Sequence, residues 1–87
     1  MWMLEELRKQ IDAVDSKIIG LLGERFRVAE KIANKKKKEG IEIYDEKREK
    51  DVLERVMINA KNVNIPQESA VLIYREIIRQ TRDFEKK

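Results

Sequence analysis

A long row of regularly spaced apolar residues near the N-terminus constrains this chain more than any other feature. Read at heptad spacing, the row is Leu4, Leu7, Ile11, Val14, Ile18, Leu21, Arg25, Val28 and Ile32. All but one are apolar, which is typical of a helix that packs against other helices along its whole length. The pattern therefore predicts one unbroken helix over residues 4–38.

This first helix is too long to be covered by the rest of one chain. About 35 residues at 1.5 Å each make a rod of about 52 Å, whereas a compact domain of this size has a radius of gyration of about 12 Å. We therefore expect a second copy to cover the seam, most simply as an antiparallel homodimer. Gly20 and Gly23, near the middle of the rod, either let two backbones approach closely or are tolerated helix-interior residues.

Composition predicts a single all-α domain over residues 1–87. The chain is 43% charged and 6% aromatic, with three glycines and one proline, which fits a helical protein rich in surface ion pairs. Cysteine and histidine are both absent. Disulfides, thiolate nucleophiles and cysteine-based metal sites are therefore excluded, and the commonest metal ligand and general base are missing.

Other features of the sequence argue against a membrane or nucleic-acid protein. The N-terminus lacks the basic and apolar regions of a signal peptide, and no stretch approaches the roughly 18 apolar residues of a membrane span. We expect a soluble cytoplasmic protein. The net charge of +3 is modest and mixed along the chain, so it helps to attract a small anion but is weak support for nucleic-acid binding.

Two further helices are predicted after the first. Lysines 35–38 followed by Gly40 suit a helix C-terminus, and Asp45 is a good N-cap for a helix over about 45–61. Residues 62–66 are predicted to form a turn. A third helix over about 66–85 follows, since Pro66 is suited to the first turn of a helix.

Several polar residues fall on the apolar faces of these helices. Arg25 interrupts the heptad row and must be paired, since an unpaired buried guanidinium is costly. Lys36 continues the face of Arg25, although lysines at a helix end are more often simply solvated. The same inward faces carry Asp45, Arg48, Glu49, Thr81 and Glu85. We interpret the set as a pocket for a small dianion, with a structural ion-pair network as the alternative for the second helix.

Four segments together carry a resemblance to a known family. They are Leu7–Asp15 (LRKQIDAVD), Leu21–Arg25 (LLGER), Lys36 and Asp45–Glu49 (DEKRE). In this spacing the chain resembles the all-helical class of chorismate mutase, from Leu4 to Glu85. The resemblance implies an intertwined homodimer of three-helix protomers with two sites. Each site would rearrange chorismate to prephenate by an intramolecular [3,3] shift, in phenylalanine and tyrosine biosynthesis, without metal or cofactor.

The resemblance also implies roles for the cations. Arg25 would bind a substrate carboxylate, and Lys36 would reach both a carboxylate and the ether oxygen of the breaking bond. Arg8 matches the arginine that the family supplies from the other protomer. Spacing agrees, because Arg8 and Arg25 are about 25 Å apart along one helix, too far to share a small ligand.

The remaining roles concern hydroxyl and ether oxygens. Asp45 and Glu49 match positions that hold the ring hydroxyl, Asp45 through its backbone. Arg48 and Thr81 match positions that help with the carboxylates, though Arg48 is equally suited to orienting its acidic neighbours. Glu85 stands where many members carry glutamine, which donates a hydrogen bond to the ether oxygen. A carboxyl donates only when protonated, so we expect a raised Glu85 pKa or activity that falls with rising pH.

Two other functions remain as alternatives. A non-catalytic helical dimerisation module explains the heptads but not the inward charges, and a nucleic-acid binder would need a basic face that acidic residues interrupt. Members of the resembled family occur both free-standing and fused to other enzymes, and the sequence fits either. Trp2 either caps the bundle end near the partner's Arg8 or lies on the surface.

Overall fold

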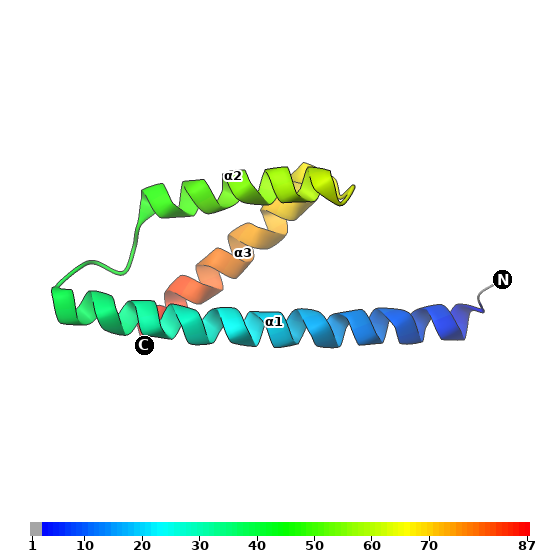
Figure 1. The fold of residues 1–87 in the computed structure, drawn as a ribbon, viewed down its shortest axis with the longest axis horizontal. Coiled ribbons are helices and arrows are strands. Elements are labelled where there is room, and N and C mark those ends of the chain that lie inside the picture. Colours follow the sequence, from blue (N-terminus) through cyan, green and yellow to red (C-terminus); the bar gives the residue numbers. More distant parts are fainter. Residues whose placement is uncertain (1–2) are drawn as a thin grey trace.

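A computed structural model describes residues 3–87 and confirms the all-α class (Figure 1). Its three helices are α1 (Leu4–Glu39), α2 (Glu46–Asn62) and α3 (Gln67–Glu85). Each boundary lies within one residue of the range predicted from the sequence. Trp2, for which two roles were considered above, lies outside the described residues.

The end of α1 and the start of α2 are set by local sequence. Gly40 adopts the left-handed conformation, with φ of 69°, and its N–H points back to the carbonyls of Lys36 and Lys37. A glycine takes this conformation without steric cost, so the helix ends there. Asp45 is the N-cap of α2, and its carboxylate accepts a hydrogen bond from the backbone N–H of Arg48 at 3.0 Å. The connecting loop is therefore short and fixed at both ends.

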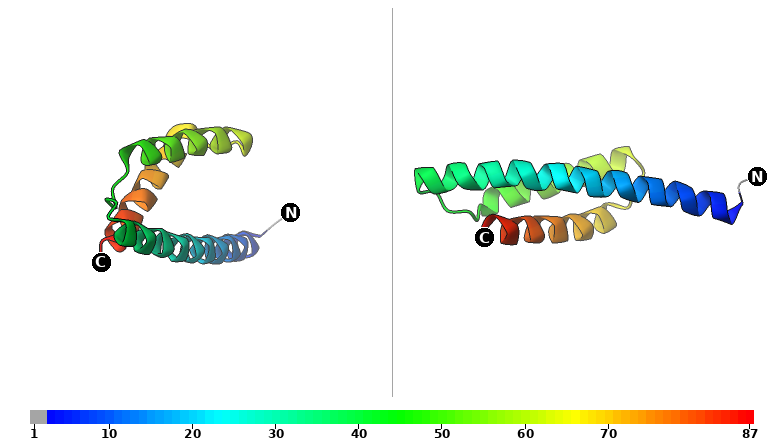
Figure 2. Two further views of the ribbon diagram at one scale, coloured as in Figure 1. Left: turned by 60° about the vertical axis from the view of Figure 1, so that its left-hand side comes forward. Right: turned by 90° about the horizontal axis from the view of Figure 1, so that it is seen from below.

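The helices form an open, C-shaped arrangement (Figure 2). α3 packs against both α1 and α2, whereas α1 and α2 do not pack on each other within residues 3–87. α2 and α3 lie beside the C-terminal part of α1, and the N-terminal part of α1 extends beyond them (Figure 1). The molecule consequently measures 57 × 23 × 16 Å, with a radius of gyration of 16.1 Å, well above the roughly 12 Å of a compact domain of this length.

The heptad row of α1 is exposed in the single protomer. Its apolar members are 41–63% exposed: Leu4, Leu7, Ile11, Val14, Ile18, Leu21, Val28 and Ile32. The buried apolar residues are only Ala29, Ala33, Ala60 and Ile78 among the residues described. A continuous apolar row of this length on a surface marks an interaction site. The predicted covering by a second copy stays a prediction.

None of the three helices combines the length and apolar character needed to cross a bilayer, over the part of the chain that the structure describes.

Gly20 and Gly23 do not contact the backbone of another helix within the described chain. A Cβ built on Gly20 touches nothing within 4 Å, and one built on Gly23 meets only the Arg27 side chain at 3.5 Å. Neither glycine is required by packing within one chain, so both interpretations of them stay open.

Candidate active site

A small cavity lies where the C-terminal half of α1, the start of α2 and the end of α3 meet. Its volume is about 250 Å³, which suits a small metabolite rather than a larger ligand. It is lined by Arg25, Val28, Ala29, Ile32, Lys36, Ile43, Asp45, Arg48, Glu49, Val52, Ile78, Thr81, Arg82 and Glu85. Seven of the eight site residues expected from the sequence are in this set, and Arg8 is the exception.

Arg25 lines this cavity from α1. A guanidinium in the apolar heptad row was expected to be paired, and it is. Its Nη1 donates a hydrogen bond to Thr81 Oγ1 at 2.6 Å, and Thr81 Oγ1 in turn donates to the Ile77 carbonyl at 2.7 Å. The guanidinium carbon also lies 5.5 Å from the centre of the Tyr74 ring, a cation–π contact. Two α3 side chains therefore hold Arg25 in place.

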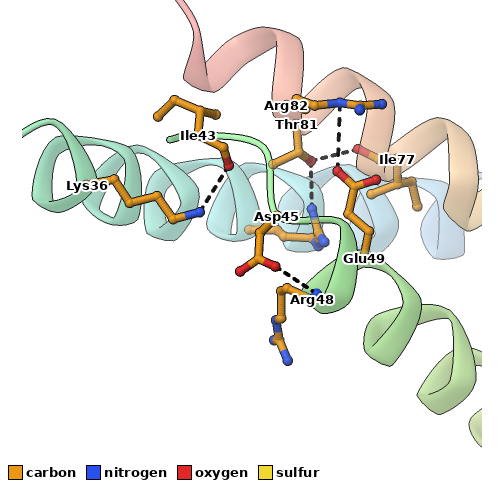
Figure 3. Close-up of polar contacts among 9 residues, drawn as sticks. Lys36, Ile43, Asp45, Arg48, Glu49, Ile77, Thr81 and Arg82 are labelled. Carbon is orange, nitrogen blue, oxygen red and sulfur yellow. Dashed lines mark hydrogen bonds and ion pairs between the residues drawn. The ribbon is translucent and has the colours of Figure 1, made fainter. Parts of the chain in front are cut away.

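Lys36 lies three turns further along the same face of α1. Its Nζ donates a hydrogen bond to the Ile43 carbonyl at 3.0 Å, which connects the helix to the α1–α2 loop (Figure 3). The ammonium has three donors and this bond uses one, so two remain for a ligand. Lys36 is half-buried whereas its lysine neighbours at 35, 37 and 38 are exposed. The helical phase thus correctly separated Lys36 from the rest of the lysine run.

The first turn of α2 supplies the opposite wall. The Asp45 carboxylate is engaged in capping the helix, which agrees with a ligand role for its backbone rather than its side chain. Glu49 is half-buried and forms an ion pair with Arg82. Arg48 lies at the edge of the cavity, and in Figure 3 its side chain points away from Lys36 and Thr81.

Glu85 lines the cavity at the end of α3. Burial is the main cause that raises the pKa of its carboxyl, and the negative charge of Glu49 adds to the rise, whereas Lys36 and Arg25 oppose it. The direction is the one expected from the sequence. The turn that carries Glu85 is anchored, because the ring of the preceding residue, Phe84, lies 5.0 Å from the ring of Phe26 on α1.

Arg8 lies apart from this cluster. It is an exposed residue in the part of α1 that extends beyond the other two helices, and it does not line the cavity. The structure of one protomer thus agrees with the expectation that Arg8 and Arg25 of the same chain do not meet.

Three residues that contact the site were not selected from the sequence. Arg82 lines the cavity, Tyr44 lies beneath its guanidinium, and Tyr74 holds Arg25. Helical phase would have found Arg82, because it lies between Ile78 and Glu85 on the inward face of α3. Tyr44 is in the loop, where no periodicity identifies the inward side chains.

Four cations and three carboxyl groups line the cavity. With Glu85 protonated the balance becomes more positive, so the site favours an anion that also carries hydroxyl groups. Within residues 3–87, histidine, cysteine and acidic side chains do not gather into a group of three suited to a metal ion.

A second hollow is larger but chemically different. It has a volume of about 460 Å³ and lies between α1 and α3, lined by Ile19, Leu22, Gly23, Phe26, Glu76, Ile77 and Gln80. Among the described residues its lining is mainly apolar and includes no cation. It is therefore a poor site for an anionic ligand, although it is the larger of the two.

Comparisons with known proteins agree on one family. The model of the family described as chorismate mutase type II matches residues 7–86. The bifunctional chorismate mutase/prephenate dehydratase of Aquifex aeolicus is 41% identical over 87 residues, which cover 97% of this chain and 24% of that protein. The chorismate mutase of Methanocaldococcus jannaschii is 34% identical over 83 residues, 95% of this chain and 84% of that protein. The chain thus spans about a quarter of the first relative and most of the second.

Proposed function

The chain belongs to the chorismate mutase type II family, and we propose that it rearranges chorismate to prephenate in phenylalanine and tyrosine biosynthesis. The observation that carries the proposal is the small cavity in which Arg25 and Lys36 face Glu49 and Glu85. Chorismate carries two carboxylates, a ring hydroxyl and an ether oxygen, and each has a suitable counterpart there. We further propose that the protein works as a soluble cytoplasmic enzyme.

Catalysis would consist of holding the reactive conformer. The carbon–oxygen bond of the enolpyruvyl ether breaks while a new carbon–carbon bond forms in the same molecule, so no co-reactant is consumed. Arg25, already fixed by Thr81 and Tyr74, is suited to hold one carboxylate in place. A pre-positioned partner of this kind lowers the entropic part of the barrier.

Charge stabilisation would complete the mechanism. The ether oxygen gains negative charge as its bond to carbon lengthens, and a donor aimed at it is worth more in the transition state than in the ground state. Lys36 has free donor capacity beyond its bond to Ile43, and a protonated Glu85 would supply the second donor. Glu49 and the Asp45 backbone would hold the ring hydroxyl.

We propose that the active form is an antiparallel, intertwined homodimer. The exposed apolar row of α1 supports this, because a second α1 would cover it. Within one chain, Arg8 lies about 25 Å along α1 from Arg25 and cannot reach the cavity. An antiparallel partner would instead bring its own Arg8 toward that cavity. The cavity of one protomer would then gain a fifth cation from the other.

The first prediction concerns activity itself. The purified protein should consume chorismate, seen as a loss of its ultraviolet absorbance, with prephenate as product. Arg25→Ala should reduce kcat/KM by roughly 100-fold or more, because one substrate carboxylate loses its partner. Comparable helical circular dichroism of the two proteins would show that the variant is folded.

A folded wild-type protein that leaves chorismate unchanged at several pH values and temperatures would refute the proposed activity. In that case the non-catalytic dimerisation module becomes the better interpretation. The two interpretations differ in what they predict for Arg25→Leu. In the enzyme this substitution should abolish activity. In a simple helical dimer it should raise stability, because a buried charge is replaced by an apolar side chain.

The second prediction tests the donation of Arg8 across the dimer. Arg8→Ala and Arg25→Ala proteins should each be nearly inactive alone. After they are mixed and allowed to exchange protomers, half of the dimers carry one intact site out of two, so about a quarter of wild-type activity should return. No recovery after exchange has been verified by mass spectrometry would show that Arg8 does not act in the partner's site.

A further inference from the structure

Arg82 joins three parts of the molecule around the cavity. Its Nε lies 3.7 Å from Glu49 Oε2 on α2, and its guanidinium carbon lies 4.9 Å from the centre of the Tyr44 ring in the α1–α2 loop (Figure 3 for the ion pair). The side chains of Arg82 and Glu49 are 28% and 26% exposed. This ion pair is thus more sheltered from solvent than the other three in the described chain, in which each side chain is at least 48% exposed.

The architecture gives such a contact unusual importance. α1 and α2 do not pack on each other in the described residues, so the α2 wall of the cavity depends on α3 and on the loop. Arg82 belongs to α3 and contacts both Glu49 on α2 and Tyr44 in the loop. An arginine suits this position because its planar group can pair with a carboxylate while it lies over an aromatic ring.

Arg79, one turn earlier on α3, provides an internal comparison. Its partner is Glu76 on the same helix, and both side chains are more than half exposed. It does not line the cavity. Two arginines on one helix therefore pair with glutamates, but only the pair of Arg82 connects different elements.

We propose that Arg82 is a positioning residue, which fixes the Glu49 carboxylate and the loop around Tyr44 so that the cavity has the shape its ligand needs. The proposal deepens the proposed function and rests on it for the identity of the ligand. Arg82 would act through Glu49, which is expected to hold the ring hydroxyl of chorismate. The bracing itself does not depend on catalysis.

Pairing with Arg82 also matters for the charge around Glu85. The charged groups that shift the pKa of the Glu85 carboxyl are Lys36 and Arg25 from α1, which lower it, and Glu49 from α2, which raises it. Asp45, Arg48 and Arg82 line the same cavity. Without Arg82, Glu49 would lose a compensating cation, and the Glu85 pKa should rise further. Without the Glu49 charge, it should fall.

The kinetic test compares Arg82→Met with Arg79→Met as the matched control. Arg82→Met should reduce kcat/KM for chorismate by roughly 10- to 100-fold, because a displaced ligand group costs this much, and Arg79→Met should stay within about twofold, as expected for an exposed pair. In a Glu49→Gln background, most of the Arg82→Met effect should disappear. An undiminished effect there would mean that Arg82 acts on the substrate directly and would overturn the proposal.

The pH profile and the structure supply independent readouts. The pH at which activity declines should move up in Arg82→Met and down in Glu49→Gln. Hydrogen–deuterium exchange of residues 41–49 should become faster in Arg82→Met and remain unchanged in Arg79→Met, whether or not the protein is active. Unchanged exchange in both variants would refute the bracing role, whereas lost activity of the wild type would refute only the proposed function.

Discussion

Replacing Lys36 with methionine is expected to lower kcat/KM for chorismate by about 100- to 1,000-fold, the usual cost of removing a donor to charge that develops in the transition state. Lys36 has two donors left after its one bond to the Ile43 carbonyl. The ether oxygen becomes negative only as its bond breaks, so the loss should fall mainly on kcat rather than on KM.

The fold should tolerate this change. Methionine keeps the unbranched stem that lies along the apolar wall of the cavity, and it is a good helix former. The lost bond to Ile43 connects the helix to the loop, and as a single hydrogen bond from a charged donor it is worth about 1.5–3 kcal/mol. The variant should therefore keep wild-type helical circular dichroism at the assay temperature, with a melting temperature lower by roughly 10 °C.

Lys38→Met is the matched control, because Lys38 lies in the same lysine run and is exposed. It removes the same charge from the same helix end but from outside the cavity. Lys38→Met should therefore keep nearly the wild-type kcat/KM, whereas Lys36→Met should show the whole predicted loss. Equal activities would show that Lys36 contributes only to the general positive field, and the assignment of the ether-oxygen donor would be wrong.

The fold could be predicted from the sequence because its determinants are local. The end of α1 depends on Gly40, and the start of α2 depends on Asp45, whose carboxylate caps the helix. Helical phase then placed Arg25, Lys36 and Glu49 on inward faces without any knowledge of how the helices meet.

What could not be predicted depends on the relation between elements. The pairing of Arg82 with Glu49 requires the rotation of α3 against α2, and the position of Tyr44 requires the path of a loop without periodicity. The contact of Tyr74 with Arg25 depends on how α3 crosses α1. The role proposed for Arg8 depends on a second copy of the chain.

Glu85 should make the activity depend on pH in a direction that the structure fixes. Burial and the charge of Glu49 raise the pKa of its carboxyl against the opposing effect of Lys36 and Arg25. The folded protein therefore holds this proton more tightly than the unfolded chain, and the contribution of Glu85 to stability falls as pH rises through the folded pKa. Only the protonated carboxyl can donate a hydrogen bond to the ether oxygen, so activity should decline over the same range.

Glu85→Gln is the decisive variant, because the amide donates a hydrogen bond at every pH in nearly the same shape. At high pH its kcat should exceed that of the wild type by roughly 10-fold or more, since a lost donor to the developing charge costs at least this much. At low pH the two should be similar, and the profile of the variant should be flat. If the wild-type profile is already flat, or if the variant keeps the wild-type decline, then another group titrates and Glu85 is not the second donor.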